Sequence, residues 1–311
     1  MRYVFIINPT AGKGKGPESL PPMIKKAFEK REEDYKIIIT KHAGDAEIAA
    51  KNEAMSGDEV CIFACGGEGT CFETVNGIVG FDNVTLGVLP CGSANDFLKF
   101  FGGKDEFLNL DNQLEGSDIY LDLIKANDFY SINQCSVGMD AMVADDMKLF
   151  KKLPLVSGPM AYNMAVVKTF LRKLGISIRI KIDDKYLGLK RCLFAVCANG
   201  PVYGGGYISA PEADPRDGKL EFLLVDRISR FRVPSFLKVY SSGMQHKKKY
   251  VTMGKCETME IEADKPISVN LDGEIFHSKT VRFEIVKKAI KFRLPCTLAQ
   301  REPEFIGAKN K

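Results

Sequence analysis

The sequence predicts an α/β protein in two parts. The N-terminal domain is an open, parallel, doubly wound sheet, and the C-terminal domain is mostly antiparallel and β-sandwich-like, with inserted helices. Three observations predict this fold. The chain has 311 residues, too many for one ordinary hydrophobic core. Up to Phe100, short apolar runs alternate with helical segments, as in successive strand–helix units. From Ser117 on, apolar and polar residues alternate with a period of two, as in antiparallel sheets.

The N-terminal part contains four strand candidates rich in β-branched and aromatic residues. The predicted strands are residues 3–7, 35–40, 61–64 and 84–89, and the predicted helices are residues 23–30, 45–55 and 70–79. A glycine- and lysine-rich loop, closed by Pro17, Pro21 and Pro22, precedes the first helix. Asp45 is the predicted N-cap of the second helix. In such a sheet, ligands bind at the loops that follow the carboxyl ends of the strands.

The third strand ends in a sharp turn with three glycines in four positions, Gly66, Gly67 and Gly69. Thr70 and Glu73 have the spacing of a capping box, which places the start of the next helix at Thr70. Glycines at such a junction let backbone N–H groups approach an anion, and the helix N-terminus adds partial positive charge. The turn therefore predicts a phosphate site, although it matches neither the Walker loop nor the dinucleotide-binding fingerprint.

The second part is expected to be rich in strands. These are residues 119–123, 130–138, 176–182, 186–198, 251–263, 267–271 and 281–285, with helices at 141–172 (interrupted near Pro154) and 230–241 and a last strand at 289–294. The expected domain limits are 1–117 and 118–290. Residues 291–311 remain as a C-terminal segment, and a return to the first domain is one path open to it.

Composition excludes several classes of protein. Apolar residues make up 45% and charged residues 27% of the chain, as in globular proteins. A formal net charge of +4 is too small to predict nucleic-acid binding. No apolar run reaches membrane-spanning length, so any membrane contact is expected to be peripheral. The nine cysteines are scattered, without a Cys-x-x-Cys pair, which predicts reduced thiols in a cytoplasmic compartment.

Several runs resemble the motifs of one family. Gly66-Gly67-Glu68-Gly69-Thr70 resembles the Gly-Gly-Asp-Gly-Thr signature of the diacylglycerol kinase catalytic-domain family, which includes sphingosine and ceramide kinases. The run from Pro90 to Phe97 resembles its Pro-x-Gly-Thr-x-Asn-Asp-Phe motif, and Asp272-Gly273-Glu274 resembles its Asp-Gly-Glu. The motifs occur in family order from Asn8 to Glu274. Glu68 replaces the family Asp, and Ser93 replaces Thr but keeps a hydroxyl.

The resemblance implies an NAD kinase/diacylglycerol kinase-like fold, with a nucleotide-binding domain at 1–117 and a lipid-substrate domain at 118–290. It implies that ATP is bound by residues of the first domain: Asn8, Thr40, Gly66, Gly67, Gly69, Thr70, Glu73, Ser93 and Asn95. A plain capping role is as well supported for Glu73. Asn95 or Asp96 could equally cap the short helix that follows.

The resemblance also implies catalytic carboxylates. Glu68 and Asp96, with Glu274, would serve catalytic Mg²⁺ and lipid orientation, and Asp272 would be the general base for the lipid hydroxyl. From the residues alone, Asp272-Gly273 is also a good hairpin turn between two strands.

A structural Mg²⁺ is implied at Asp214, Asp217 and the carbonyl of Leu220. Two carboxylates three residues apart on a turn can chelate a hard cation with nearby carbonyls. Without the resemblance, Asp-Pro-Arg-Asp-Gly is simply a favourable turn.

The predicted function is that of an ATP-dependent lipid kinase, with conversion of diacylglycerol to phosphatidic acid as the first choice. An NAD kinase-like enzyme is one alternative. Another is a nucleotide- or lipid-binding protein impaired by Glu68, because a misplacement of 1 Å can cost about a hundredfold in rate. The expected partner is a lipid at the membrane surface rather than nucleic acid, and a homodimer is left open.

Overall fold

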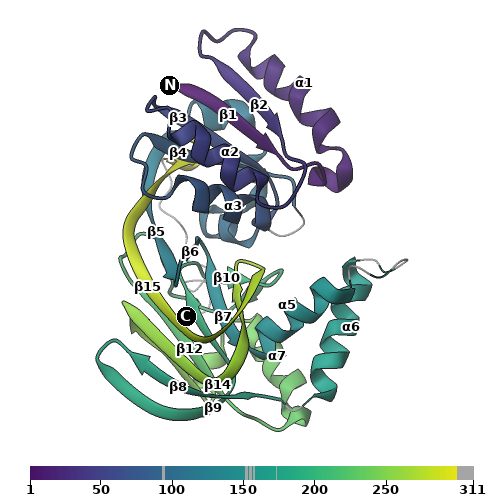
Figure 1. Ribbon diagram of the computed structural model, residues 1–311, viewed down its shortest axis with the longest axis vertical. Coiled ribbons are helices and arrows are strands. Elements are labelled where there is room, and N and C mark those ends of the chain that lie inside the picture. Colours follow the sequence, from purple (N-terminus) through teal and green to yellow (C-terminus); the bar gives the residue numbers. More distant parts are fainter. Residues whose placement is uncertain (93–94, 151–152, 154–155, 157, 173, 300–311) are drawn as a thin grey trace. The chain divides into compact units, whose positions relative to one another are not determined.

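The computed structural model describes residues 1–92, 95–150, 153, 156, 158–172 and 174–299 (Figure 1). The chain forms two compact units. Unit 1 comprises Met1–Leu123, Pro215–Asp217 and the described residues from Val286, and unit 2 comprises Ile124–Asp214 and Gly218–Ile285. The change of pattern near Ser117 coincides with the start of strand β5 (Ser117–Ala126), and the units divide within that strand, after Leu123.

Unit 1 contains the predicted parallel sheet. Its strands, in the order β4-β3-β1-β2, are β4 (Val84–Pro90), β3 (Val60–Gly66), β1 (Arg2–Ile7) and β2 (Tyr35–Ile39). The end of β15 (Glu274–Leu294) adds one more parallel strand beside β4. Every residue of β3 and β4 is buried, as expected of strands covered on both faces. The four predicted N-terminal strands and the open parallel sheet are confirmed.

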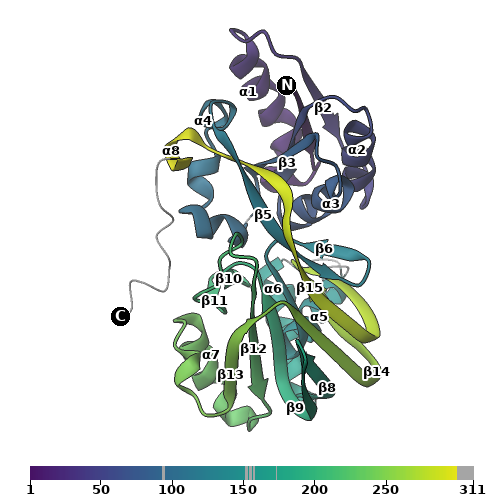
Figure 2. The same ribbon diagram turned by 90° about the vertical axis from the view of Figure 1, so that its left-hand side faces the viewer.

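Helices cover both faces of this sheet (Figure 2). They are α1 (Gly16–Phe28), α2 (Asp45–Ala54), α3 (Glu68–Ile78), α4 (Leu110–Leu114) and α8 (Cys296–Ala299), with 3₁₀ turns η1 (Ala11–Gly14), η2 (Asp96–Phe101) and η3 (Lys104–Phe107). Leu20, Ile24 and Phe28 of α1 pack against β1 and β3 on one face. On the other face α2 packs against α3, and a Cβ on Gly77 would lie 2.4 Å from the Glu47 carbonyl oxygen. Gly77 therefore permits the close contact of these two helices.

The start of α1 and the N-cap of α2 differ from the prediction. α1 begins at Gly16, not at residue 23, because Pro17 occupies the first turn, where its missing N–H costs little. Pro21 and Pro22 lie inside the helix but outside its buried stripe. Asp45 is not the N-cap of α2: Gly44 holds that position, with φ +89°. The Asp45 carboxylate instead accepts the backbone N–H groups of the preceding loop.

Unit 2 is built from antiparallel strands around a buried core. They are the end of β5, β6 (Phe129–Ser131), β7 (Gln134–Gly138), β8 (Ile176–Ile182), β9 (Lys185–Ala198), β10 (Val202–Tyr203), β11 (Tyr207–Ile208), β12 (Leu220–Asp226), β13 (Val251–Cys256), β14 (Thr258–Leu271) and the start of β15. The long strands β9 and β14 each pair with β7 along one stretch and with β8 along another. These four strands thus close on one another, which confirms the β-sandwich-like prediction.

The helices of unit 2 are α5 (Met139–Phe150), α6 (Gly158–Leu171) and α7 (Val233–Ser241), with 3₁₀ turns η4 (Arg230–Arg232) and η5 (Gln245–Lys247). α5 and α6 are joined through the buried Asp146, whose carboxylate pairs with Lys168 at 2.8 Å and Arg172 at 3.1 Å. α7 packs its Phe236 and Tyr240 side chains into the core of unit 2. No helix in the described part of the chain is both long and apolar enough to cross a bilayer.

The strand predictions in the C-terminal half need three corrections. The predicted strand 130–138 is interrupted at Ile132 and Asn133. The predicted strand 251–263 is divided between β13, which ends at Cys256, and β14, which begins at Thr258. β14 continues through exposed residues to Leu271, with a shift of register after Glu262, and so includes the predicted strand 267–271. β15 does not break before residue 289. Lys288 has φ +51°, and its N–H donates to the Asp122 carboxylate at 2.7 Å, so the strand bends there instead of ending.

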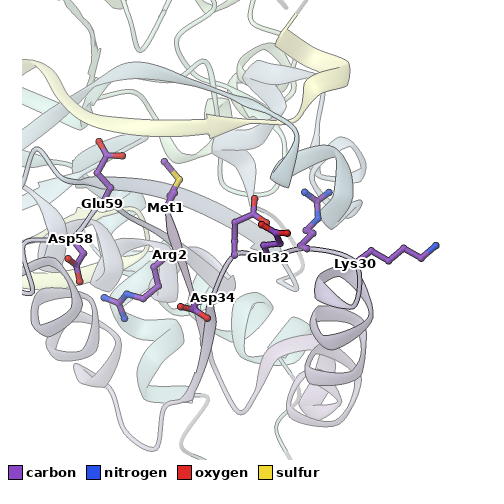
Figure 3. A pocket seen from close by; sticks show the side chains of 9 residues that line it. Met1, Arg2, Lys30, Glu32, Asp34, Asp58 and Glu59 are labelled. Carbon is purple, nitrogen blue, oxygen red and sulfur yellow. The ribbon is translucent and has the colours of Figure 1, made fainter.

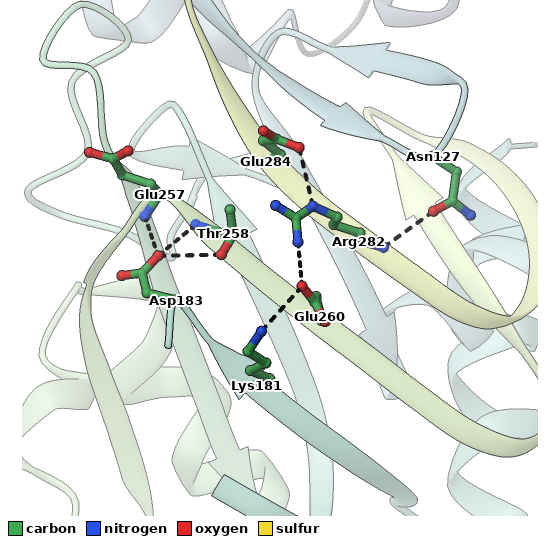
Figure 4. A network of polar contacts seen from close by, with 8 residues as sticks. All are labelled: Asn127, Lys181, Asp183, Glu257, Thr258, Glu260, Arg282 and Glu284. Carbon is green, nitrogen blue, oxygen red and sulfur yellow. Dashed lines mark hydrogen bonds and ion pairs between the residues drawn. The ribbon is translucent and has the colours of Figure 1, made fainter. Parts of the chain in front are cut away.

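One face of the unit 2 sheet carries a ladder of paired charges (Figure 4). Lys181 of β8, Glu260 of β14 and Arg282 of β15 form consecutive ion pairs, and Arg282 also pairs with Glu284 at 3.2 Å. Exposed ion pairs contribute little individually, from about 0 to 1 kcal/mol. Their partners lie directly across neighbouring strands, so the ladder favours the observed register of β8, β14 and β15.

Candidate functional site

The turn between β3 and α3 is as tight as the sequence predicts. A Cβ on Gly66 would lie 2.4 Å from the Thr70 hydroxyl oxygen, so only glycine fits there. α3 begins at Glu68, two residues before the predicted start, with Gly67 as an extended N-cap. The first N–H groups of a helix have no acceptor within it. Together with the helix dipole they form a site for an anion at the carboxyl end of β3.

Thr70 and Glu73 do not form the predicted capping box, because α3 has already begun at Glu68. The Thr70 hydroxyl accepts a hydrogen bond from the Asn8 side-chain amide at 3.1 Å. The Glu73 carboxylate accepts the backbone N–H of Ala46 at 3.2 Å. Glu73 therefore caps the neighbouring helix α2, and Thr70 ties the glycine turn to the loop after β1.

Hydrogen bonds join the loops that follow β1, β3 and β4. The N–H of Gly12 donates to the Cys91 carbonyl at 3.2 Å. The N–H groups of Cys91 and Gly92 donate to the Gly66 carbonyl at 3.0 and 3.2 Å. A Cβ on Gly92 would lie 2.7 Å from the Cα of Gly67, so the two glycine loops touch backbone to backbone. We call these three joined loops the glycine cradle.

Asn95 lies in the cradle with an unusual conformation. It is 4% exposed and left-handed, with φ +49°. Its side-chain oxygen is buried without a hydrogen-bond donor among the described residues. An unsatisfied buried acceptor costs about 1–3 kcal/mol, so the position is suited to a donor from a ligand or water. Ser93, in the same loop, lies outside the described residues.

Two residues that were predicted to be catalytic, Glu68 and Asp96, contact each other beside the cradle. The Glu68 side chain accepts the backbone N–H of Asp96 at 3.2 Å. Asp96 is almost fully buried, and its carboxylate pairs with Lys99 at 2.6 Å. Glu68, which is one methylene longer than the family's Asp, thus reaches the start of η2. Lys99 was not predicted as a site residue, although its spacing three residues after Asp96 was a usable signal.

Thr40 lies at the carboxyl end of β2 and is buried. Its N–H donates to the Ile7 carbonyl at 3.0 Å, and its hydroxyl lies 3.4 Å from the same oxygen. These contacts tie the end of β2 to β1. Of the predicted nucleotide residues, the structure joins Asn8, Thr70 and the glycines directly, whereas Thr40 and Glu73 contact neighbouring elements.

In unit 2, Asp272 lies in the turn between β14 and β15, with φ +49°. It is 6% exposed. Its carboxylate accepts backbone N–H groups from Ile132 at 2.8 Å, Asn133 at 3.2 Å and Gln134 at 2.8 Å. Burial raises the pKa of the Asp272 carboxyl, and these N–H donors oppose that rise. The same hydrogen bonds explain why the predicted strand 130–138 is interrupted.

Glu274 is more exposed than Asp272. It pairs with Lys148 of α5 at 2.6 Å, and the two side chains are 45% and 42% exposed. The pair links the β14–β15 turn to the helical insertion. As an exposed ion pair it contributes little to stability, which leaves both groups available for a solvent-facing role.

A second polar cluster in unit 2 received no role from the sequence. Asp140, at the start of α5, accepts a hydrogen bond from the Ser136 hydroxyl at 2.5 Å. The Asn270 amide contacts Ser136 at 3.5 Å and donates to the Tyr203 hydroxyl. Burial raises the pKa of the Asp140 carboxyl, against the hydrogen bonds that it accepts. Ser136 and Asp140 are only four residues apart. Tyr203 and Asn270 come from distant strands, so no local pattern could have grouped all four.

The proposed structural metal ligands lie on the loop before β12. Leu220 is the first residue of that strand and is fully buried, whereas Asp217 is exposed. Asp217 belongs to unit 1, and Asp214 and Leu220 belong to unit 2. In the described part of the chain, no three His, Cys, Asp or Glu side chains are grouped to hold a metal. The proposed set has two carboxylates and a backbone carbonyl, so the absence of a group of three such side chains does not test it.

A cavity of about 830 Å³ lies elsewhere in unit 1 (Figure 3). It is lined by Arg2 of β1, by Asp58 and Glu59 before β3, and by residues 30–34 after α1. These are the amino ends of the parallel strands, opposite to the glycine cradle. Because open α/β sheets bind ligands at the carboxyl ends, we do not assign the nucleotide to this cavity.

Comparison with known proteins agrees with the geometry. The family described as "Diacylglycerol kinase catalytic domain" matches residues 2–126, and the "YegS C-terminal NAD kinase beta sandwich-like domain" matches residues 133–293. The chain is 30% identical over 251 residues to a protein of Staphylococcus haemolyticus named "Putative lipid kinase", covering 78% of each chain. It is 27% identical to a diacylglycerol kinase of Staphylococcus carnosus, over 94% of this chain and 95% of that one.

Solved structures show the same fold. A crystal structure titled as a putative diacylglycerol kinase from Bacillus anthracis matches with a TM-score of 0.73 and 22% identity, over 94% of this chain and 96% of that chain. The two family matches cover most of the sequence, and the relatives match along most of their own length. The chain therefore belongs to the diacylglycerol kinase catalytic-domain family of lipid kinases.

Proposed function

We propose that this protein is an ATP-dependent lipid kinase that transfers the γ-phosphoryl group to the hydroxyl of diacylglycerol and forms phosphatidic acid. The observation that carries the proposal is the glycine cradle beside the Glu68 and Asp96 carboxylates, at the carboxyl ends of parallel strands. Phosphoryl transfer requires mainly positioning and charge neutralisation, and this group of residues supplies both.

The cradle fits the phosphates of a nucleotide. Gly66 and Gly92 leave no room for side chains where the loops meet, so backbone N–H groups can approach an anion closely. The unsatisfied oxygen of Asn95 offers an acceptor for the sugar or base. Asn8, Thr70, Gly67 and Gly69 complete the proposed nucleotide set, with Thr40 and Glu73 at its edges. Ser93 belongs to the set by its motif alone.

Carboxylates next to the cradle fit Mg²⁺, which prefers oxygen ligands. Glu68 and Asp96 would hold the catalytic ion, and Lys99 would keep Asp96 in place. When bound, Mg²⁺ neutralises charge on the transferring phosphoryl group. Glu274 would add a carboxylate or orient the lipid headgroup.

Asp272 is the proposed general base. Its carboxylate oxygens accept the N–H groups of Ile132 and Gln134 at 2.8 Å and share the N–H of Asn133 at 3.2 and 3.4 Å. The substrate hydroxyl would therefore take the place of this longer, shared contact. The N–H groups hold the side chain in one orientation, which a base needs to receive the hydroxyl proton. General base catalysis typically contributes about 10²–10⁴-fold.

The helical insertion of unit 2 supports a lipid substrate. Met160, Met164, Val167 and Leu171 follow one side of α6, and three of them are more than half exposed. Together with Phe150 and the stems of Lys168 and Arg172, part of this stripe lines an apolar pocket of about 600 Å³. Exposed apolar surface of this kind marks an interaction site, and we assign it to the hydrocarbon part of the lipid.

The proposal is tested by incubating the protein with radiolabelled ATP, Mg²⁺ and, separately, diacylglycerol, sphingosine or NAD⁺. We expect label in phosphatidic acid with wild type and a loss of about 10²–10⁴-fold with Asp272→Asn. Label in sphingosine phosphate would mean that the protein is a lipid kinase whose acceptor is a sphingoid base instead of diacylglycerol. Label in NADP⁺ would favour the NAD kinase-like alternative. ATP binding without transfer to any acceptor would favour a protein impaired at Glu68.

A further inference from the structure

One segment of unit 2 is strongly cationic although the whole chain is nearly neutral. Residues 227–256 contain eight Lys or Arg and no Asp or Glu. The segment comprises η4, α7, η5 and β13, and α7 contacts both 3₁₀ turns. The buried face of α7 is apolar, so the cations lie on the outside. Arg227, Arg230, Arg232, Lys247 and Lys249 are all exposed, and no described carboxylate forms an ion pair with any of them.

An aromatic ring stands among these cations. Phe231 lies between Arg230 and Arg232 in η4 and is 88% exposed. Exposing most of a phenylalanine side chain to water forgoes the free energy that its burial would bring. Nothing in the described part of unit 2 covers this ring. The sequence Arg-Phe-Arg therefore presents an apolar side chain flanked by positive charge.

The cationic segment adjoins the apolar stripe of α6. The chain leaves α6 after Leu171, and a Cβ on Gly175 would lie 3.3 Å from the Arg227 side chain. Phe170 of α6 and Phe236 of α7 pack on the same core. Exposed Leu171, at 75%, and exposed Phe231 thus belong to neighbouring parts of the unit 2 surface.

We propose that this surface binds a bilayer containing anionic lipids. We call it the basic–aromatic surface and define it by Arg227, Arg230, Phe231, Arg232, Lys247 and Lys249. The arginines and lysines would lie among anionic headgroups, and Phe231 would enter the boundary between headgroups and acyl chains. The proposal rests on the proposed lipid kinase function, because a lipid acceptor has to be reached in a membrane.

Two observations favour a bilayer over nucleic acid. Leu171 and Val167 of the adjoining helix α6 are exposed. Aliphatic groups gain burial in a bilayer but little on a phosphate backbone. The formal charge of the whole chain is only +4, so the attraction is local to this surface. A bilayer accommodates such a mixture of apolar and cationic side chains.

The test is co-sedimentation of the full chain with vesicles of neutral phosphatidylcholine alone or of phosphatidylcholine mixed with anionic phosphatidylglycerol. We expect binding to the anionic vesicles that weakens with salt. Arg230→Gln/Arg232→Gln should reduce the partition coefficient about 30-fold, since each basic residue near the surface contributes about 5-fold. Phe231→Ala should reduce it about 10-fold without the same dependence on salt.

Matched controls come from the same unit. Lys265→Gln/Lys279→Gln removes two exposed cations, and Tyr186→Ala removes an aromatic ring that is 64% exposed. Both controls should bind as wild type does. Equal losses in controls and test variants would overturn the proposal, as would binding of a short DNA duplex in preference to the anionic vesicles.

Kinase activity on dispersed short-chain diacylglycerol in neutral detergent separates the two proposals. The Arg230/Arg232 and Phe231 variants should keep the wild-type rate there and lose rate only on anionic vesicles. If the wild type binds anionic vesicles but phosphorylates no lipid, the proposed function is wrong and the membrane-binding surface is supported. If it phosphorylates dispersed lipid but does not bind anionic vesicles, the membrane-binding surface is wrong and the proposed function is supported.

Discussion

Glu68 shows how a departure from a family motif can be absorbed locally. Its side chain is one methylene longer than Asp, and its carboxylate accepts the N–H of Asp96 at the start of η2. The extra length is thus used to reach the neighbouring loop. This contact gives Glu68 a structural reason to be there as well as the proposed metal role.

We predict that Glu68→Ala lowers kcat at least about a hundredfold with little change in melting temperature, because Glu68 is only partly buried. Glu68→Asp should retain or raise activity. Steady-state kinetics with Mg²⁺, beside a thermal melt, check both. Wild-type turnover in Glu68→Ala would remove this residue from the site.

Asp272 has two roles that a single substitution disturbs together. Both of its oxygens accept backbone N–H groups, and an asparagine would point its NH₂ group at one of those donors. We therefore predict that Asp272→Asn reduces the free energy of unfolding by about 1–3 kcal/mol, in addition to reducing turnover. Denaturant unfolding and single-turnover kinetics measure the two effects separately.

Glu274→Gln is the matched control for Asp272→Asn, since its carboxylate makes an exposed ion pair with Lys148. Its stability should change by less than about 1 kcal/mol. Unchanged stability in Asp272→Asn would show that the three N–H contacts contribute nothing measurable. Unchanged single-turnover rates would mean that the base lies elsewhere, with Asp96 the next candidate.

The residues of the site were partly predictable. Asp272-Gly273 was recognised both as a hairpin turn and as a family motif, and the structure has it at the β14–β15 turn. Its contacts with Ile132 and Asn133 could not be predicted, because they join segments about 140 positions apart that only the folded sheet brings together. Tyr203 and Asn270, which complete the polar cluster around Asp140, could not be predicted for the same reason.

At the scale of elements, the glycine turn combines two kinds of glycine. Gly66 is needed for packing, because a side chain would collide with Thr70. A Cβ on Gly67 would lie 3.7 Å from the Cα of Gly92, an ordinary contact distance. Gly67 is extended rather than left-handed, so alanine there is free of backbone strain.

We predict opposite phenotypes for the two alanine variants. Gly66→Ala should destabilise the fold by about 1–3 kcal/mol through overpacking. Gly67→Ala should fold as wild type does but bind nucleotide more weakly, because a methyl group would intrude on the proposed phosphate site. Thermal melts and a fluorescent ATP analogue give the comparison. Normal nucleotide binding by Gly67→Ala would place the phosphates away from this turn.

Elements whose signals are local were predicted well, and those governed by distant partners were not. The buried strands of unit 1 follow directly from their apolar runs. The Thr70–Glu73 capping box was wrong because each side chain has a partner on another element, Asn8 and Ala46. Local spacing alone cannot distinguish a cap from a tertiary contact.

At the scale of the whole molecule, the proposed structural Mg²⁺ would stabilise the native chain by mass action. A ligand at one hundred times its dissociation constant adds about 2.7 kcal/mol. We predict that EDTA lowers the melting temperature of the wild type but leaves Asp214→Ala/Asp217→Ala nearly unchanged. Scanning calorimetry with and without Mg²⁺ measures the difference. Identical responses would leave the segment as a turn without a metal.

The last strand has a consequence for how the protein is made. The pairing of β15 with β4 joins Lys291 to Thr85 and Phe292 to Leu86, and the buried Phe292 ring stacks on Phe101. During translation, β4 therefore leaves the ribosome some two hundred residues before its neighbour. Until then it exposes an unpaired edge and an incomplete aromatic core, which invite aggregation. Ribosome-arrested chains ending near residue 250 should consequently be more sensitive to protease in their first hundred residues than chains that carry β15 clear of the exit tunnel.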